Sequence, residues 1–191
     1  ENSSAASDVY KRQVFHLAAE SRLQPAIENP IEAIVKNCVG TTTVLQCARE
    51  AGVKKLMYSS TSSGYGMNSY PNVETQPDDC LNPYSASKVA AEKFCKMYTD
   101  LYGLKTVVFR YFNVYGERSP VFGQYAPVIG IFLKQKNEGK SLTIVGDGSQ
   151  RRDFIHVKDV AAANILAATT DIPDEYYCLL YTSPSPRDLV I

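Results

Sequence analysis

The chain has 191 residues, in which 20 basic side chains balance 20 acidic ones. This length is enough for one domain with its own core, and the balanced charge predicts neither a nucleic acid nor an anionic membrane surface as a partner. No apolar run approaches the roughly 18 residues of a membrane span. The five cysteines show no paired spacing and the two histidines lie far apart, so we expect reduced thiols, a cytoplasmic protein and no metal site.

Both ends of the chain resemble translated sequencing adaptors. The first such segment runs from Ser3 to Gln13 and the second from Cys178 to Asp188, so each resemblance covers eleven consecutive residues. We therefore expect residues 1–13 and 178–191 to be non-native and exclude them from reasoning about the fold. The alternative is a natural polar N-terminus and a natural tail rich in proline and serine.

The first expected elements are a strand and a long helix. Val14–Ala19 is a short apolar run that predicts a buried strand of a parallel sheet. Asn29 and Pro30 are typical of a helix start, and apolar residues at helical spacing continue to Gly52. Gly40 inside this helix costs about 1 kcal/mol relative to alanine, so we expect close packing or a bend there.

The next elements continue an alternation of strand and helix. Lys54–Ser60 predicts a strand that ends in a cluster of hydroxyl side chains, Ser59–Ser63. Tyr84–Tyr102 carries an apolar stripe at helical spacing and ends at Gly103, and Thr106–Val114 is rich in β-branched and aromatic residues. This alternation predicts a parallel sheet with helical crossovers, whose ligand site lies at the carboxyl ends of the strands.

The character of the sequence changes after Gly116. We expect a polar loop over residues 117–124, a helix over 127–137, a short strand over 142–145 and an alanine-rich helix over 157–169.

Tyr84 and Lys88 are the first candidates for catalysis. Two residues that lie four apart on a helix share one face. An ammonium that close favours the phenolate, so we expect Lys88 to lower the pKa of Tyr84 and to suit it to acid–base work near neutral pH. The alternative, and the commoner meaning of this spacing in isolation, is a solvated helix surface.

Several ordered motifs together resemble the extended short-chain dehydrogenase/reductase family, and within it the nucleotide-sugar 4-epimerases that act on UDP-glucose or UDP-glucuronate. The matching motifs are His16-Leu17-Ala18-Ala19, Asn37-x-Val39-Gly40-Thr41, Ser59-Ser60-Thr61-Ser62-Ser63-x-Tyr65-Gly66, Tyr84-x-x-x-Lys88, Arg110-Tyr111-Phe112-Asn113-Val114-Tyr115-Gly116 and Gly146-Asp147-Gly148-x-x-x-Arg152-Asp153-Phe154-Ile155-His156-Val157.

The resemblance implies an α/β fold with an incomplete Rossmann-like, doubly wound parallel sheet and part of a smaller substrate domain. Residues 14–116 would form a partial NAD-binding core without its first βαβ unit. Residues 117–156 would belong to a nucleotide-sugar-binding domain, and residues 157–177 would return to the core.

The resemblance also implies roles for single residues. Tyr84 would take the proton of the sugar 4-hydroxyl as hydride moves to NAD, Lys88 would hold the nicotinamide ribose, and Thr61 would bridge the substrate hydroxyl and Tyr84. The sugar would pass through a 4-keto intermediate that rotates before the hydride returns. The residues expected at the cofactor are Leu17, Ala18, Ala19, Asn37, Ser59 and Tyr111, and those expected at the diphosphate of a UDP-sugar are Asn113 and Arg152.

Ser62 and Ser63 narrow the expected chemistry. Related dehydratases and decarboxylases carry a carboxylate in this pair of positions, and their elimination or decarboxylation steps use it. Two serines favour epimerisation instead. A dehydratase, decarboxylase or reductase of the same family, or a non-catalytic member that binds nucleotide, remain the alternatives.

The sequence also departs from the family pattern. No glycine-rich phosphate loop precedes His16, Gly64 replaces a more usual valine or threonine, and Val145 stands at a frequent aromatic position. We therefore expect a fragment that binds NAD poorly and has no turnover. The resemblance further implies that the parent protein is a homodimer, paired through helices near residues 31–51 and 84–102.

Overall fold

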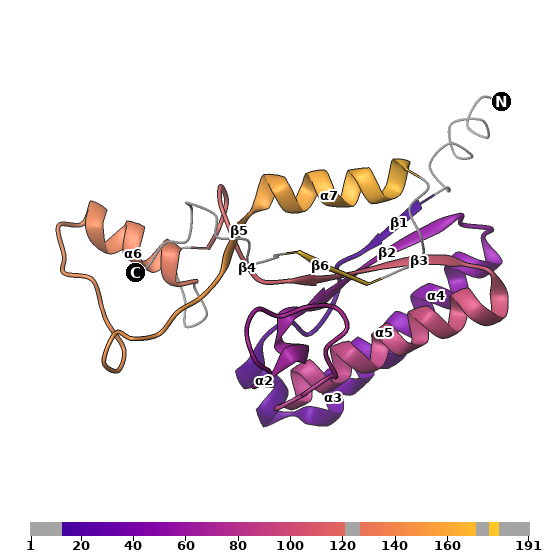
Figure 1. The fold of residues 1–191 in the computed structure, drawn as a ribbon, viewed down its shortest axis with the longest axis horizontal. Coiled ribbons are helices and arrows are strands. Elements are labelled where there is room, and N and C mark those ends of the chain that lie inside the picture. Colours follow the sequence, from indigo (N-terminus) through magenta and orange to yellow (C-terminus); the bar gives the residue numbers. More distant parts are fainter. Residues whose placement is uncertain (1–12, 121–126, 171–175, 180–191) are drawn as a thin grey trace.

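A four-stranded parallel sheet forms the centre of the molecule. The computed structural model describes residues 13–120, 127–170 and 176–179. The strands β1 (Gln13–His16), β2 (Lys55–Thr61), β3 (Lys105–Tyr111) and β6 (Tyr176–Leu179) lie in the order β1–β2–β3–β6. Figure 1 shows α7 on one face of this sheet and α3, α4 and α5 on the other. This arrangement confirms the predicted doubly wound α/β fold.

The predicted helix after Asn29 forms as three consecutive helical segments. They are α3 (Pro30–Ile34), a wider π-helical turn (Val35–Val39) and α4 (Gly40–Glu50), and a short helix α2 (Leu23–Glu28) precedes them. The Asn29 side chain caps α3 by accepting a hydrogen bond from the Glu32 amide. A Cβ atom at Gly40 would meet only the Val35 carbonyl, at 3.8 Å, so close packing does not explain this glycine. Gly40 instead follows the π-helical turn, which is a recognised cause of helix bending.

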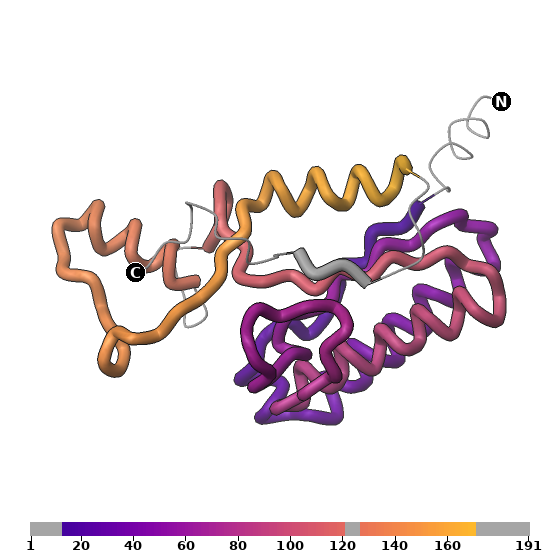
Figure 2. Tube along the Cα trace, viewed as in Figure 1, coloured from indigo at the N-terminus to yellow at the C-terminus, as the bar shows by residue number. Residues whose placement is uncertain are grey.

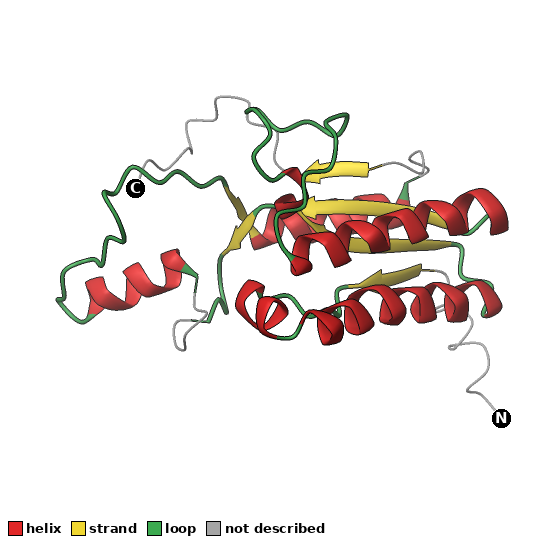
Figure 3. Cartoon of the chain, turned by 90° about the horizontal axis from the view of Figure 1, so that it is seen from below, coloured by secondary structure: helices red, strands yellow, loops and turns green. Residues whose placement is uncertain are grey.

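Helix α5 (Pro83–Tyr102) connects β2 to β3 and covers one face of the sheet. It begins with a capping box between Asn82 and Ser85 and ends at Gly103. The φ of Gly103 is 69°, a left-handed backbone conformation that glycine adopts readily. Side chains from α4, α5, β2 and β3 form the main core. Figure 3 shows the long helices lying along the strands of the main sheet. The fully buried members of this core are Leu45, Leu56, Tyr58, Ala91 and Cys95. None of the helices in the described ranges is long and apolar enough to cross a membrane.

Helix α7 (Val157–Thr169) covers the opposite face of the sheet with small side chains. Ala167 packs against Met57, Val107 and Phe109, which point away from the main core because side chains alternate along a strand.

Strand β1 differs from the prediction of a buried strand. It pairs only with β2, so it is the edge strand of the described sheet, and its Phe15 side chain is 45% exposed. It also ends at His16, which leaves Leu17 to Ala19 in the following loop. Gln13 in β1, and Cys178 and Leu179 in β6, belong to the segments that resemble adaptors.

The chain leaves the main sheet at Phe112. The predicted strand over residues 106–114 is therefore two strands, because β4 (Asn113–Tyr115) pairs in parallel with β5 (Phe154–His156) in a separate small sheet. Helix α6 (Val128–Asn137) forms as predicted, and the segment that connects it to β5 extends away from the main sheet (Figure 2). The predicted strand over residues 142–145 is wrong: this segment pairs with no described strand, and Ile144 and Val145 are exposed.

Candidate active site

The candidate proton-transfer residues meet at the carboxyl edge of the main sheet. Thr61 is the last residue of β2, and a short 3₁₀ turn, Ser62–Tyr65, follows it. Tyr84 and Lys88 lie in the first two turns of α5. The Thr61 side chain lies close enough to the Tyr84 hydroxyl to lower the Tyr84 pKa, so the structure brings the predicted pair together across β2 and α5. This pair can pass a proton to or from a hydroxyl group placed against it.

The pKa of Tyr84 does not follow the prediction. Burial raises the pKa of this phenol, and the nearby Thr61 side chain opposes only part of the rise. The Lys88 ammonium, which we expected to lower the Tyr84 pKa, lies instead over the Tyr58 ring, 4.2 Å from its centroid. In this arrangement Tyr84 is held as the neutral phenol, which donates a proton more readily than it accepts one.

Lys88 carries a nearly buried ammonium without a hydrogen-bond acceptor among the described residues. Its side chain is 3% exposed, and burial lowers its pKa to about 8. An ammonium in this state favours a ligand oxygen as its partner. The ribose hydroxyls of NAD supply such oxygens, so Lys88 fits the cofactor role that the sequence predicts for it.

Ser59 and Tyr111 form a polar chain with a residue that the sequence did not single out. The Tyr111 hydroxyl accepts hydrogen bonds from Ser59 Oγ at 3.2 Å and from Asn164 Nδ2 of α7 at 2.7 Å. Asn164 lies in an alanine-rich helix. The sequence signal that could have identified it as a site residue is its polar side chain within that apolar stretch. It fixes Tyr111, one of the predicted cofactor residues, against the sheet.

Asn37 holds the loop that follows β1. Its side chain is fully buried, accepts a hydrogen bond from the Glu20 amide at 2.7 Å and donates to the Glu20 carbonyl at 3.1 Å. It also donates to Ser87 Oγ on α5 at 2.9 Å. Asn37 thereby connects the end of β1, where Leu17 and Ala18 are exposed and Ala19 is partly buried, to the helix that carries Lys88.

Asn113 is the first residue of β4, and Arg152 lies in the loop before β5. Asn113 Nδ2 donates to the Asp153 carbonyl at 2.9 Å, which places Asn113 next to the residue that follows Arg152. Both side chains are exposed, and the Arg152 guanidinium donates to the Arg151 carbonyl at 2.8 Å. Their predicted contact with a diphosphate stays a prediction.

Gly64 lets the 3₁₀ turn lie directly on α5. A Cβ atom at this position would approach Val89 Cγ2 to 2.7 Å, and Val89 is only 6% exposed. Replacing Gly64 with valine should therefore destabilise the chain by about 1–3 kcal/mol, as overpacked cores do. Urea denaturation measures this loss, and Val89→Ala in the same chain should recover part of it. A Gly64→Val chain as stable as the wild type would contradict this account of the turn.

Comparisons with known proteins identify the family of this chain and agree with its fold. Residues 2–178 match the NAD dependent epimerase/dehydratase family. The chain is 40% identical over 153 residues to a UDP-glucuronate 4-epimerase of Thermodesulfobacterium geofontis, covering 80% of this chain and 46% of that protein. It is 38% identical over 170 residues to a UDP-N-acetyl-alpha-D-glucosaminuronate decarboxylase of Bacillus cytotoxicus, covering 85% of this chain and 51% of that protein.

A solved structure shows the same likeness in three dimensions. The UDP-N-acetylglucosamine 4-epimerase of Methanobrevibacter ruminantium, in complex with UDP-N-acetylmuramic acid, superposes with a TM-score of 0.84 at 36% identity. The match covers 87% of this chain and 54% of that one. The chain spans about half the length of the curated relatives it matches. The predicted family and its cofactor are thus confirmed at the level of the family: this chain belongs to the NAD-dependent epimerase/dehydratase family.

Proposed function

We propose that the whole protein is an NAD-dependent nucleotide-sugar 4-epimerase that acts on a UDP-sugar. The observation that carries the proposal is the meeting of Thr61, Tyr84 and Lys88 at the carboxyl edge of the sheet, next to a turn that begins with Ser62 and Ser63. Proton transfer at one hydroxyl needs a phenol and a relay hydroxyl, and both are present. Elimination or decarboxylation in relatives uses a carboxylate that this turn lacks.

Each candidate residue has a separate role in the proposed reaction. Bound NAD supplies a reversible hydride acceptor. Lys88 would hold the ribose hydroxyls, and a Lys88 ammonium placed at them rather than over the Tyr58 ring would favour the phenolate of Tyr84. Tyr84 would take the proton of the sugar 4-hydroxyl, bridged by Thr61, as the hydride passes to NAD and the 4-keto sugar forms. Tyr84 would return this proton when the hydride returns to the rotated sugar.

The whole protein should interconvert UDP-glucose and UDP-galactose, or the corresponding uronic acids, without added reductant. Chromatography of the UDP-sugars after incubation measures this reaction, and NAD released on denaturation reports the bound cofactor. Formation of a 4-keto-6-deoxy sugar would assign a dehydratase, and release of carbon dioxide would assign a decarboxylase. Bound nucleotide with no turnover of any UDP-sugar would favour the non-catalytic alternative.

The 191-residue chain alone should show no turnover, because it spans about half the length of its relatives and contains no glycine-rich phosphate loop. Epimerase activity from this chain alone would contradict that expectation.

The whole protein should be a homodimer in the cytoplasm. Ile31, Val35 and Val39 lie four residues apart on one helical face, and each is at least 50% exposed. Val39→Glu should shift the whole protein from dimer to monomer in sedimentation, whereas Glu32→Gln on the neighbouring α3 should leave it a dimer. A Val39→Glu dimer as tight as the wild type would contradict pairing through this face.

A further inference from the structure

Arg110 and Glu92 form a buried ion pair behind the candidate active site. Arg110 lies on β3 and is 4% exposed, and Glu92 lies on α5 and is fully buried. Arg110 Nε lies 3.0 Å from Glu92 Oε1, and Arg110 Nη2 lies 2.6 Å from Glu92 Oε2, so the contact is bidentate. This pair fixes the position of α5 relative to β3.

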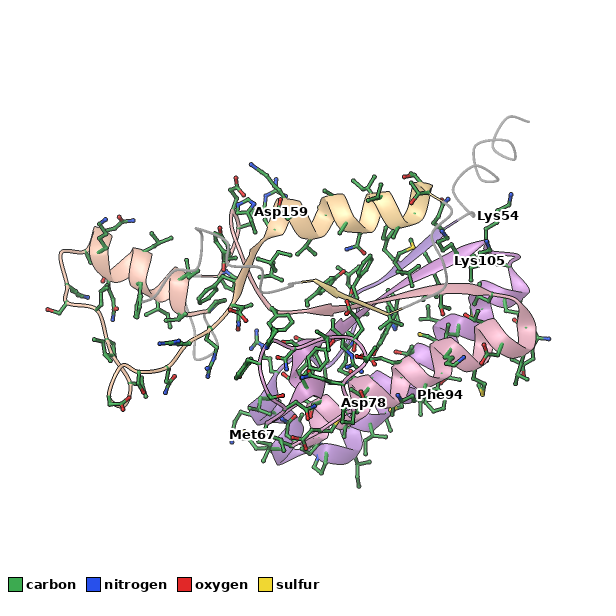
Figure 4. The ribbon with its side chains drawn as sticks, viewed as in Figure 1. Lys54, Met67, Asp78, Phe94, Lys105 and Asp159 are labelled. Atoms are coloured by element: carbon green, nitrogen blue, oxygen red, sulfur yellow. The ribbon has the colours of Figure 1, made fainter. Side chains whose placement is uncertain are left out.

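Two further side chains extend the pair to the segments beside it. Ser60 Oγ donates a hydrogen bond to Glu92 Oε1. Arg110 Nη2 also bonds Asp78 Oδ1, at 2.5 Å, and Asp78 pairs with Lys93 at 2.8 Å. Figure 4 shows Asp78 beside α5. The cluster of Ser60, Asp78, Glu92 and Arg110 thus joins β2, β3, α5 and the loop that follows the 3₁₀ turn.

Each anchor of this cluster lies next to a proposed proton-transfer residue. Ser60 immediately precedes Thr61 and pairs in register with Arg110. Glu92 follows Lys88 by four residues and Tyr84 by eight, so all three lie on one face of α5. Ser60 and Glu92 therefore belong to the two elements, β2 and α5, that carry Thr61 and Tyr84, and their hydrogen bond fixes how these elements lie against each other.

Stability alone is a weak reason for such a cluster. Removing two charges from water costs free energy that their attraction seldom exceeds, and apolar residues of similar volume often serve as well. A bidentate pair does specify geometry, because its hydrogen bonds are satisfied in only one arrangement.

We propose that Ser60, Glu92 and Arg110 are positioning residues, which fix Thr61 against Tyr84 and hold a carboxylate behind the Lys88 ammonium. The proposal rests on the proposed function for its kinetic part only. The charge part concerns Lys88 itself and is measurable in this chain without turnover.

The electrostatics around Lys88 support the charge part. Burial lowers the pKa of Lys88, and the Glu92 carboxylate opposes that shift. The titratable groups that face or interact with Lys88 are Cys95 and Glu92 on its own helix, Cys38 on the π-helical turn, His16 on β1 and Tyr58 on β2. Glu92 is the one carboxylate among them, so its removal should make Lys88 lose its proton at a lower pH.

The first test is an NMR titration of Lys88 in the chain labelled with ¹³C at the lysine Cε, with the signal assigned from its loss in Lys88→Met. Glu92→Gln keeps the shape of the side chain and should lower the Lys88 pKa by roughly one unit. Lys96→Met, which breaks the exposed pair with Asp100 on the same helix, should leave it unchanged. An unchanged Lys88 pKa in folded Glu92→Gln would overturn the charge part.

The second test uses the whole protein and Ser60→Ala, which leaves the ion pair in place and so preserves the fold even if Glu92→Gln does not. We expect kcat to fall about tenfold, with KM and the melting midpoint nearly unchanged, because small displacements of reacting groups cost rate rather than affinity. Wild-type kcat in Ser60→Ala would overturn the positioning part. Absence of epimerase activity in the wild type would contradict the proposed function instead, and the NMR titration would still decide the charge part.

Discussion

Replacing Tyr84 with phenylalanine in the whole protein should lower kcat about 10²- to 10⁴-fold, which is the usual contribution of a positioned acid–base group. The substitution removes only the hydroxyl that lies near the Thr61 side chain, at the carboxyl edge of the sheet. The ring and its packing stay in place, so the fold and the amount of bound NAD should not change. Steady-state kinetics and NAD released on denaturation measure the two effects separately.

Tyr98→Phe is the matched control for this experiment. Tyr98 lies on the same helix, and its hydroxyl bonds the Gln46 side chain at 2.9 Å, away from Thr61. Its loss should leave kcat close to the wild-type value. Unchanged turnover in Tyr84→Phe would remove this phenol from the mechanism.

Replacing Lys88 with methionine should stabilise the chain below pH 8, and this gain should disappear as the pH rises to 10.5. Burial lowers the folded pKa of Lys88 to about 8, whereas the unfolded side chain titrates near 10.4. Between these values the unfolded chain binds more protons, so the lysine chain gains stability as the pH rises. The difference between the two chains should shrink by about 3 kcal/mol over this window.

Urea denaturation of both chains at several pH values measures that difference. Burial also raises the pKa of Cys95 to about 12, which lowers stability in alkali, but Cys95 is present in both chains and its effect largely cancels. Lys96→Met, on the exposed side of α5, should show no such pH dependence relative to the wild type. A constant difference between Lys88→Met and the wild type from pH 7 to 10.5 would show that Lys88 is not held in a desolvated state.

Local signals predicted the fold well where they were strong. Gly103 ends α5 in the structure, and Asn29 and Pro30 begin the helical stretch that precedes β2. The prediction failed where a segment depends on a partner. Residues 142–145 have strand-like composition, but no described strand pairs with them. The chain likewise leaves the main sheet at Phe112 because the residues that follow pair with β5. This strand lies about forty residues further along the chain, and the sequence around Phe112 does not indicate the pairing.

The sequence predicted which residues meet in the site better than it predicted their protonation. Thr61 and Tyr84 come together because a strand and the following helix pack as neighbours. The pKa of Tyr84 depends on burial and on where the Lys88 ammonium points, and the four-residue spacing determines neither. The position of Glu92 on the same helical face could have been predicted, because Glu92 continues the spacing of Tyr84 and Lys88 by one further turn. Its pairing with Arg110 could not, because Arg110 lies on β3 and the spacing along the helix does not indicate it.

The continuous segment from β2 through α5 to β3 has a consequence for how such proteins diversify. Lys55 to Tyr111 contains Thr61, Tyr84, Lys88, Glu92 and Arg110, whereas Asn113 and Arg152 lie outside it in the small sheet and its loop. Recombination at the two ends of this segment would inherit the proton-transfer groups and their ion pair as one block. Exchange of the flanking sequence would leave the contacts within this segment intact.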